Sequence, residues 1–145
     1  MPPIVRNILA VILGLVIGGA VNMGIIVGGG QLLPPPAGVD VNDIKSINAH
    51  IQEYSVLQLM TPFVAHALGV LVGAFIAARV AASRKMSMAF VIGAFFLLGG
   101  IMAVSMVPNA PLWFDVLDLI VAYLPMAWLG GRLGGAMSER SSRAS

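Results

Sequence analysis

The chain has 145 residues, of which 59% are hydrophobic and 10% are charged, and its mean hydropathy is +0.96. Soluble domains carry about 25% charged residues, so a soluble fold would leave much of this apolar surface exposed to water. The absence of cysteine excludes disulfides and thiolate metal sites, and the scattered basic residues behind the net charge of +2 argue against nucleic-acid binding.

Four apolar runs are each about as long as the roughly 20 residues that a helix needs to cross a bilayer. They predict an all-α, polytopic membrane protein built as a four-transmembrane-helix bundle. The predicted spans cover residues 8–33, 57–82, 86–107 and 112–131. We expect one transmembrane domain over residues 1–145, with a disordered polar tail at 137–145.

The first run imitates a secretory signal peptide. Arg6 precedes an apolar stretch at residues 8–17, and the small residues Gly18 and Ala20 follow. The apolar core of a signal peptide usually ends after about 7 to 15 residues. Because the apolar run continues past residue 20, we interpret it as a retained membrane anchor.

The first connection, residues 34–56, begins with three prolines. A helix is predicted after them, at residues 41–53, with Ile44, Ile47 and Ile51 on one stripe. An apolar stripe on an otherwise polar helix is typical of a helix that lies in the bilayer interface. We therefore predict a short interfacial helix in this loop.

The same predicted helix carries an acidic face with one imidazole, formed by Asp43, His50 and Glu53. Carboxylates and imidazole together can bind a divalent metal. A solvated helix face accounts for the pattern more simply, and metal capture is the alternative.

Charged residues are divided between the two sides of the predicted bundle. Seven of the eight basic residues fall on one side, namely Arg6, Arg79, Arg84, Lys85, Arg132, Arg140 and Arg143. Five of the six acidic residues fall on the other side, together with Lys45, namely Asp40, Asp43, Glu53, Asp115 and Asp118. By the positive-inside rule, both termini are expected in the cytoplasm and the 34–56 loop outside.

Small residues predict which spans pack together. Gly14 and Gly18 lie on one face of the first span, and Gly69 and Gly73 on one face of the second. Helices in lipid associate where small residues allow close backbone approach, so we expect these two faces to meet. In the fourth span, Gly130 and Gly134 are interpreted as the end of the helix, and Pro125 is expected to kink it beside Tyr123.

Four polar residues are expected at depth in the bilayer: Asn22, His66, Asp115 and Asp118. Ionisable groups there are costly and usually mark a function or a buried partner. One hypothesis is an outward-open site for a proton, a metal cation or a small polar ligand, because imidazole exchanges a proton near neutral pH. The alternative is a buried His66–Asp118 pair that joins two spans, with Asp115 solvated at the interface.

Three stretches resemble small four-span inner-membrane proteins of bacteria that carry no assigned activity. They are PPPAGVD at residues 34–40, AHALGVLVGAFIAA at 65–78 and AYLPMAWLGG at 122–131. The resemblance covers most of the chain and implies a place in the bacterial inner membrane, but no chemistry. Lipoprotein signal peptidases need aspartates on two helices and small multidrug exporters need a carboxylate in the first span, and neither pattern is present.

We therefore expect a membrane protein without enzymatic activity that handles an ion or a small ligand at the outward polar layer. The alternative is an accessory or structural subunit of a larger membrane complex with no ligand site. No motif names a cofactor. Apart from the lipid bilayer, the expected partners are further copies of the chain or a larger complex, because four short spans enclose little room for a transport path.

Overall fold

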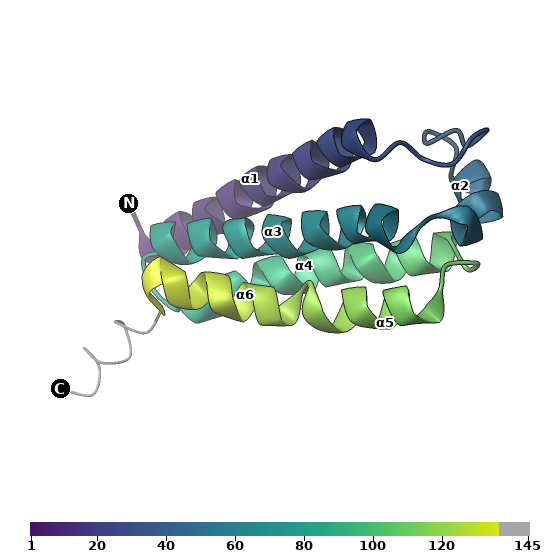
Figure 1. Ribbon diagram of the computed structural model, residues 1–145. Coiled ribbons are helices and arrows are strands. Elements are labelled where there is room, and N and C mark those ends of the chain that lie inside the picture. The colour runs from purple at the N-terminus through teal and green to yellow at the C-terminus, as the bar shows by residue number, and fades with distance from the viewer. Residues whose placement is uncertain (137–145) are drawn as a thin grey trace.

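The computed structural model describes residues 1–136, which form helices and no strand. Four segments are long and apolar enough to cross a membrane: α1 (Pro3–Leu32), α3 (Val56–Val80), α4 (Lys85–Met106) and the segment Leu112–Ala136. This last segment consists of α5 (Leu112–Val121), α6 (Leu124–Gly131) and a π-helical turn, η2 (Arg132–Ala136). The chain is a multi-pass membrane protein built as a four-helix bundle (Figure 1), which confirms the predicted fold class. The predicted disordered tail lies outside the described residues.

Helix α1 begins at Pro3, well before the predicted start at residue 8. Proline suits the first helical turn, where its missing N–H would have no partner. Arg6 and Asn7 therefore lie inside the helix. Arg6 Nε donates to the carbonyl oxygen of Val80 at 2.7 Å, and Asn7 Oδ1 accepts from the backbone N–H of Ala82 at 2.9 Å. These bonds join the start of α1 to the α3–α4 connection.

The predicted glycine faces of α1 and α3 lie against each other. A Cβ atom built on Gly14 would be 2.6 Å from the carbonyl oxygen of Gly73, and one built on Gly18 would be 2.6 Å from that of Gly69. Real Cβ atoms essentially never come so close to another heavy atom. The two backbones therefore approach at a distance that only glycine allows.

The glycines near the end of the fourth span also pack, so the interpretation that they only end the helix was wrong. A Cβ on Gly130 would collide with the carbonyl oxygen of Leu71, and one on Gly134 would lie 2.7 Å from that of Phe75. Both acceptors belong to α3. Helix α3 is thus the centre of the bundle. It packs against α1 at one pair of glycine contacts and against the end of the fourth span at another.

The 34–56 connection folds over one end of the bundle. Its predicted helix is shorter than residues 41–53: α2 (Ile44–His50) is followed by the 3-10 turn η1 (Ile51–Glu53). The helix starts late because the Asp43 side chain accepts from the N–H of Lys45 at 3.0 Å and caps it. The backbone N–H of Asn109 donates to Asn48 Oδ1 at 2.9 Å, which ties this loop to the α4–α5 connection (Figure 1).

The two ends of the bundle carry opposite charge. One end, here called the basic end, holds the start of α1, the α3–α4 connection and the end of α6 (Figure 1); its charged residues are Arg6, Arg79, Arg84, Lys85 and Arg132. The other, here called the acidic end, holds α2 and the α4–α5 connection; its charged residues are Asp40, Asp43, Lys45 and Glu53. The predicted separation of charge is thus present among residues 1–136, whereas Arg140 and Arg143 lie outside the described residues.

The fourth span is broken between α5 and α6, as Pro125 predicted. Tyr123 has φ −110° and ψ −82°, which lie outside the helical region. Proline has no N–H to donate to the preceding turn and its ring crowds that turn. Helical bonding resumes when the N–H of Ala127 donates to the carbonyl oxygen of Tyr123 at 2.8 Å. The break changes the direction in which Tyr123 projects, and this change matters for the site described next.

Candidate functional site

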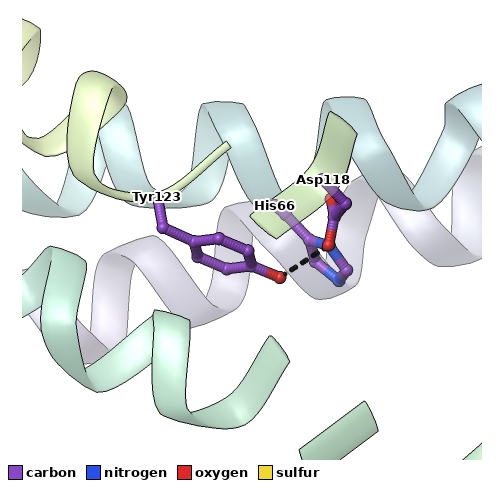
Figure 2. A network of polar contacts seen from close by, with 3 residues as sticks. All are labelled: His66, Asp118 and Tyr123. Carbon is purple, nitrogen blue, oxygen red and sulfur yellow. Dashed lines mark hydrogen bonds and ion pairs between the residues drawn. The ribbon is translucent and has the colours of Figure 1, made fainter. Parts of the chain in front are cut away.

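Three side chains from two spans meet inside the bundle. His66 comes from α3, Asp118 from α5 and Tyr123 from the break before α6 (Figure 2). His66 Nδ1 lies 2.9 Å from both carboxylate oxygens of Asp118. The Tyr123 hydroxyl donates to Asp118 Oδ2 at 2.9 Å, and its oxygen lies 3.0 Å from His66 Nδ1. We call these three residues the triad.

We infer the positions of the mobile protons of the triad from these distances. Nδ1 lies equally close to both oxygens of Asp118, as expected for an N–H that points between them. The single hydroxyl hydrogen of Tyr123 is directed at Oδ2. Asp118 therefore accepts two hydrogen bonds, and a neutral His66 carries its proton on Nδ1. The second ring nitrogen, Nε2, is then a hydrogen-bond acceptor.

Packing holds the triad in place. Asp118 is 3% exposed and Tyr123 is 1% exposed. The rings of His66 and Tyr123 stack, with their centroids 5.7 Å apart. On the other side, the Tyr123 ring occupies space that a side chain at Gly100 of α4 would fill, since a Cβ there would collide with the hydroxyl. Gly100 is therefore required for Tyr123 to reach Asp118.

A cavity of about 820 Å³ borders the triad at the acidic end. Helices α1, α3, α4 and α5 and the 34–56 loop supply its walls, which are mostly apolar. Its polar lining residues are the triad members His66 and Asp118, together with Asn42, Tyr54, Gln58, Thr61 and Asp115. Pockets that bind small molecules usually measure about 300 to 1,000 Å³ and combine apolar walls with a few polar groups. The cavity matches that description in both respects.

His66 is the more exposed of the two triad residues that line the cavity. Its side chain is 21% exposed, compared with 5% for Asp118. Nε2 makes no hydrogen bond with any residue between 1 and 136, whereas Nδ1 is held by Asp118. In Figure 2 the ring edge that carries Nε2 points away from Asp118 and Tyr123. The arrangement leaves one oriented acceptor available to a molecule in the cavity.

Asp115, the second predicted carboxylate, lines the same cavity one turn before Asp118. No described residue donates a hydrogen bond to its side chain, which is partly exposed. The structure therefore brings Asp115 to the site but not into the triad.

Asn22 is not brought to the site. It lies in the α1–α3 contact, where a Cβ on Gly69 would be 2.9 Å from the Asn22 Cβ. Its Oδ1 atom is buried and has no hydrogen-bond partner among residues 1–136, and Asn22 is not among the residues that line the cavity. Its depth in the bilayer was a poor guide, because depth does not say which face of α1 the side chain occupies.

The possible metal residues of the loop are not gathered either. His50 Nδ1 lies 2.9 Å from Glu53 Oε1, while Asp43 is occupied as the cap of α2. Among residues 1–136, no group of three or more histidine, aspartate or glutamate side chains is placed to hold a metal ion. His50 and Glu53 instead form an exposed pair within one turn.

Tyr123 and Gly100 are site residues that the sequence did not single out. Tyr123 was noted only as the neighbour of Pro125, and Gly100 was not considered as a site residue. The proline was the available signal, since a helix break is what turns Tyr123 back towards Asp118. Residues five apart on an unbroken helix do not share a face.

Tyr123→Phe is expected to lower the free energy of unfolding by about 1 kcal/mol, because it removes one hydrogen bond and leaves the ring in place. The matched control is Tyr54→Phe, since the Tyr54 hydroxyl makes no hydrogen bond with a described residue. Reversible unfolding of both variants in mixed micelles, followed by circular dichroism, measures the difference. Equal stability of the two variants would show that the Tyr123–Asp118 bond contributes nothing.

Comparisons of the chain with protein-family models, with curated proteins and with solved structures found no match. The geometry of the site is therefore the basis for the function proposed below.

Proposed function

We propose that this membrane protein binds a small, largely apolar ligand in the cavity at the acidic end, and that the triad recognises the polar group of that ligand. The observation that carries the proposal is the position of His66. Asp118 fixes the ring through Nδ1, while Nε2 remains available beside about 820 Å³ of mostly apolar space. A neutral imidazole held in this way accepts a hydrogen bond, so the expected ligand carries an O–H or N–H group.

A ligand of this kind is favoured over a metal ion. His66 Nδ1 already bonds to Asp118, and Asp115 is not joined to the triad. A divalent cation would need several converging ligands. Apolar walls, in contrast, favour a molecule with a hydrocarbon part. The proposal is for binding without chemical conversion.

The alternative is a structural subunit in which the triad only joins α3 to α5. Hydrogen bonds within the triad would serve that role. A purely structural pair needs no cavity beside it, however. The cavity is therefore the specific observation that favours ligand binding over the accessory role.

We further propose that the protein lies in the inner membrane of a bacterium with both termini in the cytoplasm. The separation of charge supports this orientation, because basic residues concentrate on the cytoplasmic side of membrane proteins. The acidic end and its cavity would then face outward. A ligand would reach the site from the outer leaflet or from the space outside.

Single cysteines test this orientation cleanly, since the chain contains none of its own. In intact cells, Asn42→Cys in the 34–56 loop is expected to react with a membrane-impermeant maleimide. Ala82→Cys in the α3–α4 connection is expected to react only after the cells are lysed. Labelling of Ala82→Cys in intact cells, with Asn42→Cys protected, would reverse the proposed orientation.

Photolabelling tests the ligand site directly. The probe is a dodecanol that carries a diazirine, and the comparison is the equally long dodecane with the same group. In bilayers, the alcohol is expected to label peptides of α3 and α5 more strongly than the alkane does. His66→Phe should reduce that excess roughly fivefold, the equivalent of one hydrogen bond of about 1 kcal/mol.

A cavity-filling variant and its matched control complete the experiment. Val104→Trp places a large ring where Val104 lines the cavity, and it is expected to abolish labelling by both probes. Ile120→Trp, on the exposed face of α5, is expected to leave labelling unchanged. If His66→Phe lowers stability while the preference for the alcohol persists, the triad has only the structural role.

A further inference from the structure

A second cavity lies at the basic end, between the start of α1 and the start of α4. Its volume is about 570 Å³, and its apolar wall includes Ile4, Ile8, Val11 and Met88. The three α1 residues follow one another at helical spacing and so form one stripe. From Pro3 to Ile12, the wall extends about 14 Å along α1 at 1.5 Å per residue. We call this cavity the groove.

The groove and the larger cavity are separated by the point where α1 and α4 approach each other. There a Cβ on Gly14 would lie 2.9 Å from Ile92 Cδ1, and one on Gly18 would lie 3.4 Å from Phe96 Cζ. Ile8 is 55% exposed and Ile4 is 70% exposed. The groove is therefore a hollow in the surface of the bundle, within the hydrocarbon-facing part of α1.

Polar groups gather at one place in the groove, where the α3–α4 connection lines it with Ser83 and Arg84. Asn7 Nδ2 donates to Ser83 Oγ at 3.2 Å, so the serine hydroxyl hydrogen is left for another acceptor. Arg84 is exposed. A guanidinium and a hydroxyl together are well suited to phosphate oxygens.

Among residues 1–136, the charge around the groove has one sign. Every charged residue that the structure describes at the basic end is a lysine or an arginine. A molecule that combines an anionic head with a hydrocarbon chain would match both the polar and the apolar parts of the groove. A water-soluble anion would match only the polar part of the groove, and an apolar helix of another protein would match only the apolar part.

We propose that the groove binds an anionic phospholipid, with its phosphate at Arg84 and Ser83 and the first part of an acyl chain along Ile4, Ile8 and Val11. The site is separate from the cavity beside His66 and does not depend on the function proposed for it. Bound lipid would fill the space between α1 and α4 at this end. Its headgroup would place the basic end at the surface of an anionic leaflet.

Native mass spectrometry of the full-length protein in detergent tests the proposal. The probes are phosphatidylglycerol and phosphatidylcholine with identical acyl chains. The wild-type protein is expected to retain phosphatidylglycerol preferentially. Arg84→Asn should reduce that preference about fivefold, because the loss of one basic residue near an anionic lipid surface has an effect of about this size. Asparagine is chosen because Arg84 has φ +51°, a left-handed conformation that asparagine tolerates.

Ile8→Trp tests the apolar part of the groove without changing charge, and it is expected to reduce retention of both lipids. The matched control is Leu9→Trp, because Leu9 is exposed but does not line the groove. Inorganic phosphate at millimolar concentration should not displace the lipid if the acyl chain is bound. Equal retention of the two lipids by the wild-type protein would overturn the proposal, as would equal effects of the two tryptophans. Displacement by phosphate alone would indicate a simple anion site and overturn it too.

Discussion

Gly18→Val is expected to lower the free energy of unfolding by about 3 kcal/mol, at the upper end of what overpacking usually costs. The new side chain would start 2.6 Å from the carbonyl oxygen of Gly69 and 3.1 Å from the Cα of Gly73. Both are backbone atoms of α3, so no side-chain rotation can relieve the collision. Helices α1 and α3 would have to separate, which would remove a close backbone contact between them.

The adjacent residue supplies the control. A Cβ built on Gly19 meets nothing within 4 Å, so Gly19→Val adds the same side chain on a face that points away from the bundle. Its effect is expected to stay below about 0.5 kcal/mol, as for surface substitutions. Reversible unfolding in mixed micelles compares the two variants. If both unfold at the same denaturant fraction, the glycine contact does not hold α1 in place.

Asp118→Ala is expected to cost a similar amount, about 3 kcal/mol, because it leaves two donors without an acceptor and each buried, unsatisfied donor costs about 1 to 3 kcal/mol. The substitution leaves the His66 Nδ1–H and the Tyr123 hydroxyl without their acceptor. Tyr123 is 1% exposed, so water cannot easily replace the lost bond. The cost for the two donors together lies towards the lower end because the His66 side chain is 21% exposed.

Asp115→Ala is the matched control for that prediction. Asp115 lies one turn earlier on α5 and faces the same cavity, but no described residue bonds to its carboxylate. Its removal is expected to change stability by less than about 0.5 kcal/mol. An equal loss in the two variants, measured by the same unfolding experiment, would show that the triad has no special role in stability.

A double substitution separates the stability of the triad from its role in binding. Replacing His66 by phenylalanine and Asp118 by leucine together removes both polar partners and refills most of their volume. Apolar replacement of a buried pair is often neutral or stabilising. We expect the double variant to recover most of the stability lost in Asp118→Ala and to show no preference for the alcohol probe. A preference that persists would place recognition outside the triad.

The sequence predicted the fold well because the bilayer restricts it. A helix satisfies its backbone hydrogen bonds within a single segment, so length and hydropathy suffice to locate apolar helical spans. The contact of Gly14 and Gly18 with Gly69 and Gly73 followed from small-residue spacing, and the helix break followed from Pro125. The start of α2 was predicted too early, because the apolar spacing does not show that the side chain of Asp43 caps the helix.

The site was predicted only in part. His66 and Asp118 lie at similar depths on two spans, and that was enough to suggest a pair. Asn22 was placed with them by depth alone, whereas the rotation of α1 turns it towards Gly69. The cavity could not be predicted, because it depends on how α1 and α4 diverge after their contact at Ile92 and Phe96. Crossing angles depend on the three-dimensional packing of several helices together.

Ligand binding as proposed requires that His66 present an unprotonated Nε2 to the ligand while Asp118 holds Nδ1–H. Nitrogen-15 NMR of histidine-labelled protein in bilayers measures this directly, because the chain has two histidines and His50→Gln leaves only His66. We expect a protonated Nδ1, and an unprotonated Nε2 whose signal moves when dodecanol is added but not when dodecane is added. A proton on Nε2, or a signal that dodecanol leaves unchanged, would contradict the claim.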